Sequence, residues 1–248
     1  MEELVIALHI HSVYSDGTGT FAQIGKSALK AGLDAFITTD HNVWIKDSEA
    51  YYQEGRKKVI MLNGEEIHDP SLIDGKNHLL VFGADRELAP FSIDPQSLIN
   101  QVKRSEGLSF IAHPIEDPLT LIGEKSYSWL NWDVKGYSGI ELWNQMSEFK
   151  SRSNNFLKII LHAFFPKHLA LGPLEKTLKL WDKLLLKGKP VVIIGGNDAH
   201  SLKIKKGPLK ITIYPYDFQF RSFRTHILTP SKLSGTLETD KKMILDAL

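Results

Sequence analysis

The run "LVIALHIH" (residues 4–11) decides the fold class of this chain. It is nearly continuous in aliphatic residues and ends in two histidines, His9 and His11, one residue apart. Such a run is typical of a strand buried on both faces of a parallel sheet. Six similar runs follow, at residues 34–41, 59–66, 78–83, 108–114, 138–144 and 190–200.

Helical segments separate several of these runs. Thr20 is a candidate N-cap for a helix that ends at Gly32. Asp94 and Pro95 begin a second helix in the same way. Alternation of strands and helices implies a parallel sheet. Seven strands favour a closed or nearly closed barrel, so we predict an α/β fold with a single domain over residues 1–248.

Residues 145–187 depart from this alternation. They follow a strand without the usual short connection, and we predict a helical insertion there. Leu178, Trp181 and Leu185 recur at helical spacing and are expected to be core residues. The last segment, 236–248, has a helical pattern that stops without a cap, which is compatible with a longer parent chain.

The composition excludes several classes of protein. Among 248 residues, 30 Lys and Arg balance 29 Asp and Glu, so no global charge attracts nucleic acid or anionic lipid. Cysteine is absent, which excludes disulfides and thiolate metal sites. No apolar run is long enough to span a bilayer, and histidine interrupts the first run too early for a signal peptide. We expect a soluble, cytoplasmic protein.

Six of the seven apolar runs carry, at or near one end, ionisable residues that buried strands normally avoid. Most lie where a run ends, and His78 is an exception because it begins its run. Catalytic groups of α/β barrels gather at the carboxyl ends of the strands. The candidate ligands of one shared metal site are His9, His11, Asp16, His41, Glu66, His78, His113, Asp198 and His200.

The number of candidates predicts the number of ions. His9 and His11 lie two apart, so a strand would direct both to one side. One divalent ion takes about three to six protein ligands, and nine are too many for it. Two or three ions bridged by carboxylates fit better. Ligation by histidine and carboxylate without sulfur suits Zn, Mn or Fe.

These residues stand in motifs that resemble the PHP domain family (polymerase and histidinol phosphatase). The motifs are "HIHSVYSDG", "GLDAFITTDHN", "NGEEIH", "NHLLVFG", "IAHP" and "GGNDAHS", in the family's order from residue 9 to residue 201. The resemblance implies a distorted barrel of seven β/α units and a metal-dependent phosphoesterase.

The resemblance also implies a trinuclear site. One ion would be held by His9, His11, Glu66 and Asp198; a second would share Glu66 and add His78 and His113; a third would take Asp16, His41 and His200. Glu66 is preferred to Glu65 because the family pattern places its acid two residues after a glycine, here Gly64.

Such a site predicts hydrolysis of a small phosphate ester by a metal-bound hydroxide, since metal binding lowers the pKa of water to about 7 at zinc. Asp198 is a candidate catalytic residue because its loss should abolish turnover. His68 is a second candidate, either as proton donor to the leaving group or as a residue that orients a ligand. Lys150 and Arg152 are candidates for substrate binding, with a solvated helix surface as the alternative.

Two other activities stay open. The same metals could cleave an amide or carbamate, because the PHP family resembles the amidohydrolases. A nuclease or proofreading module is also possible, although the balanced charge does not indicate nucleic acid. A non-catalytic interaction domain would be expected to lose ligands, and here the set is complete. The substrate, the metal and the oligomeric state are left open.

Overall fold

The computed structural model describes residues 1–248 except 73–74, 166–170, 189–190 and 207–208, and leaves the side chains of 204–211 undescribed. The strands are β1 (Glu2–Ala7), β2 (Ala35–Thr38), β3 (Ala50–Glu54), β4 (Lys57–Ile67), β5 (Leu79–Phe82), β6 (Leu108–Ile111), β7 (Gly139–Asn144), β8 (Val192–Gly196), β9 (Leu202–Lys206), β10 (Leu209–Ile213) and β11 (Thr225–Thr229). The α-helices are α1 (Phe21–Ala31), α2 (Pro95–Arg104), α3 (Gln145–Arg152), α4 (Phe156–Phe164), α5 (Glu175–Leu186), α6 (Tyr216–Ser222) and α7 (Leu237–Asp246). Two short 3₁₀ helices cover Ala89–Phe91 and Thr120–Ile122.

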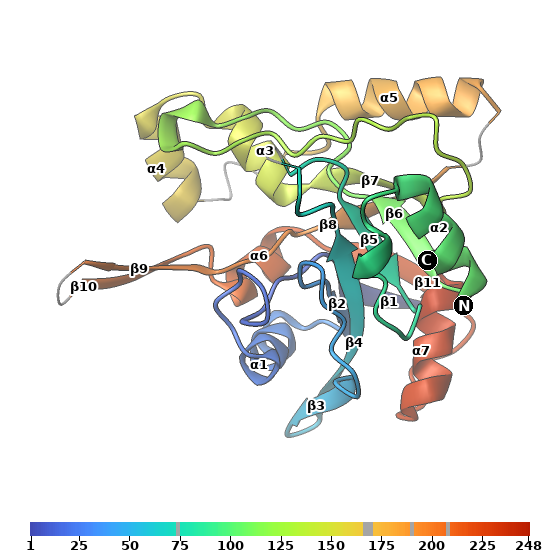
Figure 1. Ribbon diagram of the computed structural model, residues 1–248. Coiled ribbons are helices and arrows are strands. Elements are labelled where there is room, and N and C mark those ends of the chain that lie inside the picture. Colours follow the sequence, from blue (N-terminus) through green and yellow to red (C-terminus); the bar gives the residue numbers. More distant parts are fainter. Residues whose placement is uncertain (73–74, 166–170, 189–190, 207–208) are drawn as a thin grey trace.

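The main sheet is a nearly closed barrel. Its strands follow the order β11-β1-β2-β4-β5-β6-β7-β8, with β3 paired to β4 outside this path (Figure 1). The two end strands, β11 and β8, lie close to each other: the Thr225 hydroxyl of β11 donates to the Gly195 carbonyl of β8 at 2.8 Å. The predicted distorted α/β barrel is thus confirmed, and all seven apolar runs contain a strand.

The expectation of a parallel sheet holds for only part of the barrel. Strand β5 is antiparallel to both β4 and β6, and β11 is antiparallel to β1. Antiparallel neighbours need no helical crossover; residues 68–78 join β4 to β5, whereas α2 lies between the antiparallel strands β5 and β6. Strand β11 was not among the predicted strands, because Thr225, His226 and Thr229 interrupt its apolar pattern.

The helix signals in the sequence act as expected. The Thr20 hydroxyl accepts from the Gln23 amide, and the Gln23 side chain accepts from the Thr20 amide, which completes a capping box. Gly32 ends α1 in the left-handed conformation with φ of 76°. Asp94 caps α2 through the Gln96 amide.

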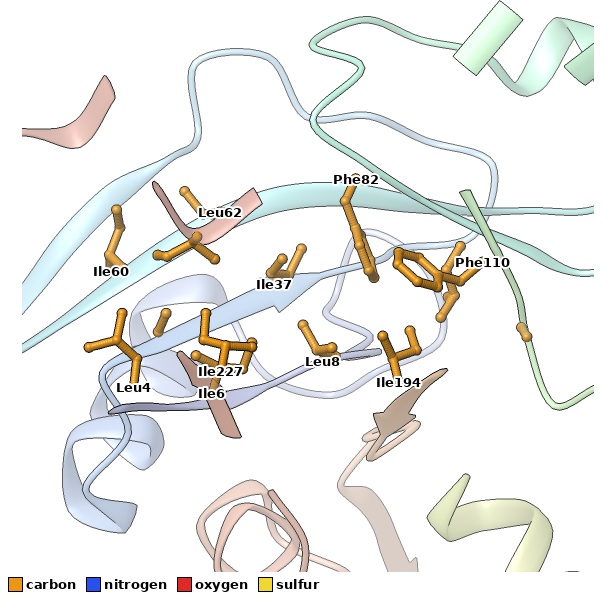
Figure 2. Packing of buried hydrophobic residues seen from close by; sticks show 14 residues of the cluster. Leu4, Ile6, Leu8, Ile37, Ile60, Leu62, Phe82, Phe110, Ile194 and Ile227 are labelled. Carbon is orange, nitrogen blue, oxygen red and sulfur yellow. The ribbon is translucent and has the colours of Figure 1, made fainter. Parts of the chain in front are cut away.

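The inside of the barrel is filled by alternate residues of its strands. Leu4, Ile6 and Leu8 point inward together with side chains from β2, β4, β5, β6, β8 and β11 (Figure 2). Ile244 of α7 belongs to the same cluster and is fully buried. Helix α7 therefore closes one end of the barrel. Clusters with α1 and α6 on one side, and with α2 and α5 on the other, cover its outside.

The segment after β7 contains α3, α4 and α5, which lie across the opposite end (Figure 1). The expectation that Leu178 and Leu185 are core residues was wrong, because they are 37% and 42% exposed. Only Trp181 of that set packs on the core, against the α2 side. That 145–187 is an insertion stays a prediction. Within the described residues, no helix is long and apolar enough to cross a membrane.

Candidate metal centre

The predicted ligands meet at the end of the barrel opposite α7. The strands β1, β2, β4, β6 and β8 direct their carboxyl ends there. His78 joins them because β5 runs the other way. Leu79, at its start, pairs with Ile67 at the end of β4 and with Ile111 at the end of β6. The reversed strand explains why the site residue of this run comes first in it.

His9 and His11 come together for a different reason than predicted. Strand β1 ends at Ala7, and His9 has a left-handed φ of 62°. The His11 amide donates to the Ala199 carbonyl at 2.9 Å, and the Ala199 amide donates to the His9 carbonyl at 3.1 Å. The expected strand alternation therefore does not operate here. Backbone pairing with the segment after β8, which carries Asp198 with φ of 51°, sets the direction of both rings.

Glu66 lies at the centre of the site and is 1% exposed. One carboxylate oxygen, Oε2, lies 2.9 Å from His9 Nε2 and 3.1 Å from His11 Nε2. The other, Oε1, lies 2.7 Å from His78 Nδ1 and 3.0 Å from His113 Nε2. A carboxylate with two nitrogens on each oxygen has the placement of a bridging ligand.

Glu65 points to the opposite side of β4. Its Oε2 accepts from the Leu88 amide at 3.1 Å. Burial, together with the neighbouring Glu87, raises the pKa of Glu65 to about 9, so it is neutral at pH 7. The two consecutive acids therefore have different environments, and the alternation of a strand separates them.

A second group of side chains lies at the mouth of the site. His200 Nε2 is 3.2 Å from Asp16 Oδ1, and His41 Nε2 is 3.7 Å from Asp16 Oδ2. The His11 ring stacks on His200 with centroids 4.2 Å apart. The Asp16 side chain is 56% exposed, so this group faces the solvent while Glu66 does not.

Asp40 holds the loop that carries Asp16. Its carboxylate accepts from the Ser12 amide at 2.7 Å, the Ser12 hydroxyl at 2.6 Å and the Ser15 hydroxyl at 2.7 Å. Sequence reasoning used "TDH" only for its histidine and missed this acid. The serines on both sides of Tyr14 were the available signal.

The electrostatics favour ionised carboxylates beside histidines. Burial alone would raise the pKa of Glu66, but His9, His41 and His78 hold it well below its usual value. Burial would also raise the pKa of Asp198, and His9 with His11 again lowers it. For His11 the opposite holds, since burial lowers its pKa but Asp198 and Glu66 raise it to about 10. The carboxylates are thus held in their charged form by positive charge beside them, which a bound cation would also supply.

The unpaired atoms fit metal ions as well. Buried polar atoms normally have hydrogen-bond partners. Here both ring nitrogens of His11, and one nitrogen each of His41, His78 and His113, are buried without a well-formed hydrogen bond, although His11 Nε2 lies within ion-pair distance of Glu66 and Asp198. Three groups have donor atoms within 4.8 Å of one another and correspond to the sequence-based sets; they are His9/His11/Glu66, Glu66/His78/His113 and His11/Asp16/His41/His200. A further group, His9/His113/Asp198, links the first two.

Glu141 is a functional candidate that the sequence reasoning missed. It is buried within β7, and its Oε1 lies 2.8 Å from His9 Nδ1. Its Oε2 accepts from the His113 amide at 2.7 Å and from the Asn144 amide group at 2.9 Å. A carboxylate behind a metal-binding histidine fixes the tautomer and the ring orientation. The signal was present, since "SGIELWN" carries an acid inside an apolar run.

A cavity of about 420 Å³ opens over the cluster. Its lining combines ligand candidates, including His41, His113 and Asp198, with Tyr127, Phe149 and further apolar side chains. His68 lines this cavity and stacks on His78 with centroids 4.4 Å apart. Burial lowers the pKa of His68 to about 4, helped by His78.

Lys150 and Arg152 differ in position. Lys150 lines the cavity, but its ammonium contacts the Glu116 carboxylate at 3.1 Å, the Lys125 carbonyl at 3.1 Å and Glu124 at 3.5 Å. Arg152 donates to Glu148 at 2.8 Å and is not among the described cavity residues. The side chains of Lys150 and Arg152 are therefore both already paired with carboxylates of the protein.

The family comparison agrees with the motifs. Residues 7–116 match the family model of the PHP domain. The matched part holds the ligand candidates from His9 to His113. No curated protein sequence matches the chain significantly.

Several solved structures are similar to this chain at low identity. A two-domain protein from Bacteroides vulgatus that contains a predicted PHP-like metal-dependent phosphoesterase is 17% identical, with a TM-score of 0.43; the match covers 80% of this chain and 52% of that one. The lesion-specific endonuclease PfuEndoQ from Pyrococcus furiosus is 15% identical, with a TM-score of 0.48, covering 100% and 57%. A putative metal-dependent phosphoesterase from Bifidobacterium adolescentis is 14% identical, with a TM-score of 0.43, covering 79% and 87%. The chain thus spans about half the length of the first two.

Proposed function

We propose that this protein is a metal-dependent phosphoesterase, a hydrolase of phosphoric esters that uses three divalent ions. The observation that carries the proposal is the placement of Glu66, whose two oxygens each lie within 3.1 Å of two histidine nitrogens at the base of a cavity. Zn, Mn and Fe all suit this set of nitrogen and oxygen donors.

The side chains would divide the work as follows. His9, His11, Glu66 and Asp198 would hold the first ion, Glu66 with His78 and His113 the second, and Asp16, His41 and His200 the third. Ions in such a site supply Lewis acidity and lower the pKa of a bound water. Glu141 would keep the His9 ring in place, and the apolar side chains of the cavity lining would limit the access of bulk water.

The cavity supports a small phosphate ester as the substrate. Its volume of about 420 Å³ is in the range of small-molecule sites. Lys150 is the single Lys or Arg among the described residues that line it, so the ions would bind most of the phosphoryl charge. Lys150 would contact the substrate only by exchanging Glu124, its most exposed partner. Arg152 would need to leave Glu148.

His68 is the group that we propose beside the leaving group. It lines the cavity next to His41 and His78. As a proton donor it would have to be protonated when the substrate is bound, and the negative charge of a phosphate ester would favour that form.

The test compares the turnover of different esters by protein that has been loaded with Zn, Mn or Fe. We expect turnover of p-nitrophenyl phosphate, lower turnover of bis-p-nitrophenyl phosphate and none of a p-nitrophenyl carbamate. Carbamate turnover without phosphoester turnover would replace the proposal by an amidohydrolase-like activity. Preferred cleavage of oligonucleotides would replace it by a nuclease. Elemental analysis of the same samples should find about three ions per chain, and fewer than about two would contradict the trinuclear site.

A further inference from the structure

We propose that the outward face of α4 (Phe156–Phe164) is the interface at which two copies of this chain form a symmetric dimer. The helix lies at the margin of the molecule, next to α3 (Figure 1). Its outward residues are apolar, whereas a surface helix normally directs its polar residues outward. The proposal concerns the assembly of the protein and does not depend on the proposed function.

The exposed apolar side chains of α4 form one face. On the helix and its C-cap residue they are Phe156, Leu157, Ile160, Leu161, Phe164 and Phe165, each between 38% and 77% exposed. Positions four apart are neighbours on a helix, so these side chains are contiguous. The only Lys, Arg, Asp or Glu in the helix is Lys158. Apolar surface that is poor in charge marks the core of an interaction site.

The area of this face matches that of a dimer interface. At 49–63% exposure, each of the three phenylalanines presents on the order of 100 Å² to solvent. With the three aliphatic side chains the face reaches roughly 600 Å², the upper end of the range for the largest apolar patch on a monomer. A standard interface takes about 800 Å² from each partner, so α4 would supply most of it.

The chain itself holds α4 by few contacts. Ile159 packs in a cluster with Phe149 and Tyr214, and within this fully described helix only His162 is buried. The Tyr214 hydroxyl donates to the His162 carbonyl at 2.8 Å. A helix of 9 residues gains most of its stability from packing of its apolar face. In α4 the larger apolar face is the unpacked one, and a second copy would pack it.

The spacing along α4 makes this face complementary to itself. Phe156, Ile160 and Phe164 form one row of residues four apart, and Leu157 and Leu161 form the next row. Rows of this spacing interdigitate when two helices cross at about −50°, and both helices then use the same rows. A two-fold axis brings the same patch of both subunits together, so the middle of each row would meet its counterpart.

A lipid surface fits this helix less well. Helices that lie in a membrane interface carry Lys and Arg on their polar face and gain from anionic lipid. The side of α4 opposite the apolar face packs on the protein through Ile159 and His162, and Lys158 is its only cation. The observations therefore favour a second copy as the occupant.

The test is analytical ultracentrifugation of the full chain at about 1–100 µM, since the dimer fraction depends on protomer concentration. We expect a dimer that dissociates on dilution. Ile160→Glu should raise its Kd by about 100-fold or more, because two-fold symmetry places two carboxylates in one apolar interface. The matched control is Ile93→Glu, at a residue outside α4 that is 76% exposed, and it should dimerise like the wild type.

Two results would overturn the proposal. One is a wild type that stays monomeric over this range, and the other is an Ile160→Glu variant that dimerises as tightly as the wild type. A monomer that floats with vesicles of phosphatidylcholine and phosphatidylserine, and no longer does so as Ile160→Glu, would replace the second copy by a membrane. If circular dichroism shows that Ile160→Glu is unfolded, Leu157→Lys replaces it, at a residue that is 77% exposed.

Hydrogen exchange tests the interface without any substitution. Amide exchange of α4 in the wild type should slow as the chain concentration rises through the Kd, because packing of the helix opposes its local opening. Exchange of α7, at the other end of the barrel, should not change. Equal exchange of α4 in monomer and dimer would place the interface elsewhere.

The dimer has a consequence for the cavity, and this consequence rests on the proposed function. Met146, Phe149 and Lys150 of α3 line the cavity, and Ile159 of α4 packs beside Phe149. Monomeric Ile160→Glu should therefore have a higher KM for p-nitrophenyl phosphate than Ile93→Glu, at equal metal content. An equal KM would overturn this consequence alone, and a dimer that cleaves no phosphoester would refute the proposed function alone.

Discussion

The two ends of the barrel differ in whether their buried polar groups are hydrogen-bonded. At the end closed by α7, Asp240 is buried and accepts hydrogen bonds from the Ser234 amide and hydroxyl, the Gly235 amide and the Tyr51 hydroxyl. At the other end, buried nitrogens of the histidines are left without partners. Satisfied groups stabilise a fold, and unsatisfied ones keep binding capacity for a ligand. The two ends should therefore respond differently to mutation.

The largest effect is expected at the metal end. Asp198→Ala removes a carboxylate whose oxygen lies 3.4 Å from both His9 Nε2 and His11 Nε2. We expect turnover to be abolished and at least one ion to be lost, because the first ion would keep only three protein ligands. Turnover assays and elemental analysis of the purified protein measure this. Loss of activity with full metal content would contradict the ligand role.

The matching change at the closed end is Asp240→Ala. It leaves the amides of Ser234 and Gly235 and the Tyr51 hydroxyl without their acceptor. We expect the free energy of unfolding to fall by about 2–4 kcal/mol, since hydrogen bonds to a charged group contribute about 1.5–3 kcal/mol each and are not additive. Urea denaturation measures it. The metal content of the folded protein should not change, and a change would show that the two ends are coupled.

The pH dependence of the same contact has a defined sign. Burial alone would raise the pKa of Asp240, but hydrogen bonds from Tyr51, Ser234 and Gly235 lower it. Its contribution is therefore present above the ordinary carboxyl pKa of about 4 and is lost as the pH falls through the lowered value. The stability difference between the wild type and Asp240→Ala should shrink below about pH 4 in denaturation curves, and a constant difference would contradict it.

A smaller effect at the metal end is expected for Glu141→Gln. The amide keeps the volume of the side chain, but one of its two ends becomes a donor that cannot accept from both His9 and the His113 amide. We expect metal affinity to fall by about 10- to 100-fold, as for other residues behind metal ligands. Chelator competition measures it. Glu141→Asp, which retains the charge, should recover part of the affinity, and a purely structural role would show equal losses in both.

The smallest effect is expected for His226→Ala. His226 is half exposed on β11 and contacts Glu3 at 2.8 Å. Surface ion pairs contribute about 0–1 kcal/mol. Turnover and metal content should equal those of the wild type in the assays above. A loss of turnover or of metal content in His226→Ala would mean that such losses are not specific to substitutions at the metal end.

The sequence predicted the members of the site better than the reasons for their positions. Polar residues at the ends of apolar runs identified the ligand candidates because a barrel collects strand ends at one place. His9 and His11 meet through left-handed backbone and pairing with the Ala199 segment, which strand periodicity does not encode. The place of His78 required the reversal of β5, a property of strand order rather than of any single residue.

Residues that act through others were harder to predict. Glu141 lies inside a strand. The sequence alone does not distinguish a buried acid there from one at a sheet edge or at the surface, because its hydrogen-bond partners come from other segments. Lys150 lines the cavity, but Glu116 and Glu124, which contact its ammonium, come from other segments of the chain. The leucines of α5 have helical spacing, but helical spacing alone does not decide which face meets the core.

The close approach of Gly196 to the site limits what can be changed there. A Cβ atom at this position would lie 1.8 Å from Glu141 Oε1 and 2.8 Å from the His9 Cβ. Glu141 and His9 contact each other, so neither side chain can move away without breaking that contact. Any side chain at 196 would therefore separate the carboxylate from the imidazole. In a saturation library, this position should accept glycine alone among the metal-loaded clones, although alanine is the smallest possible change. Gly196 thus reports on the metal centre without ever contacting an ion.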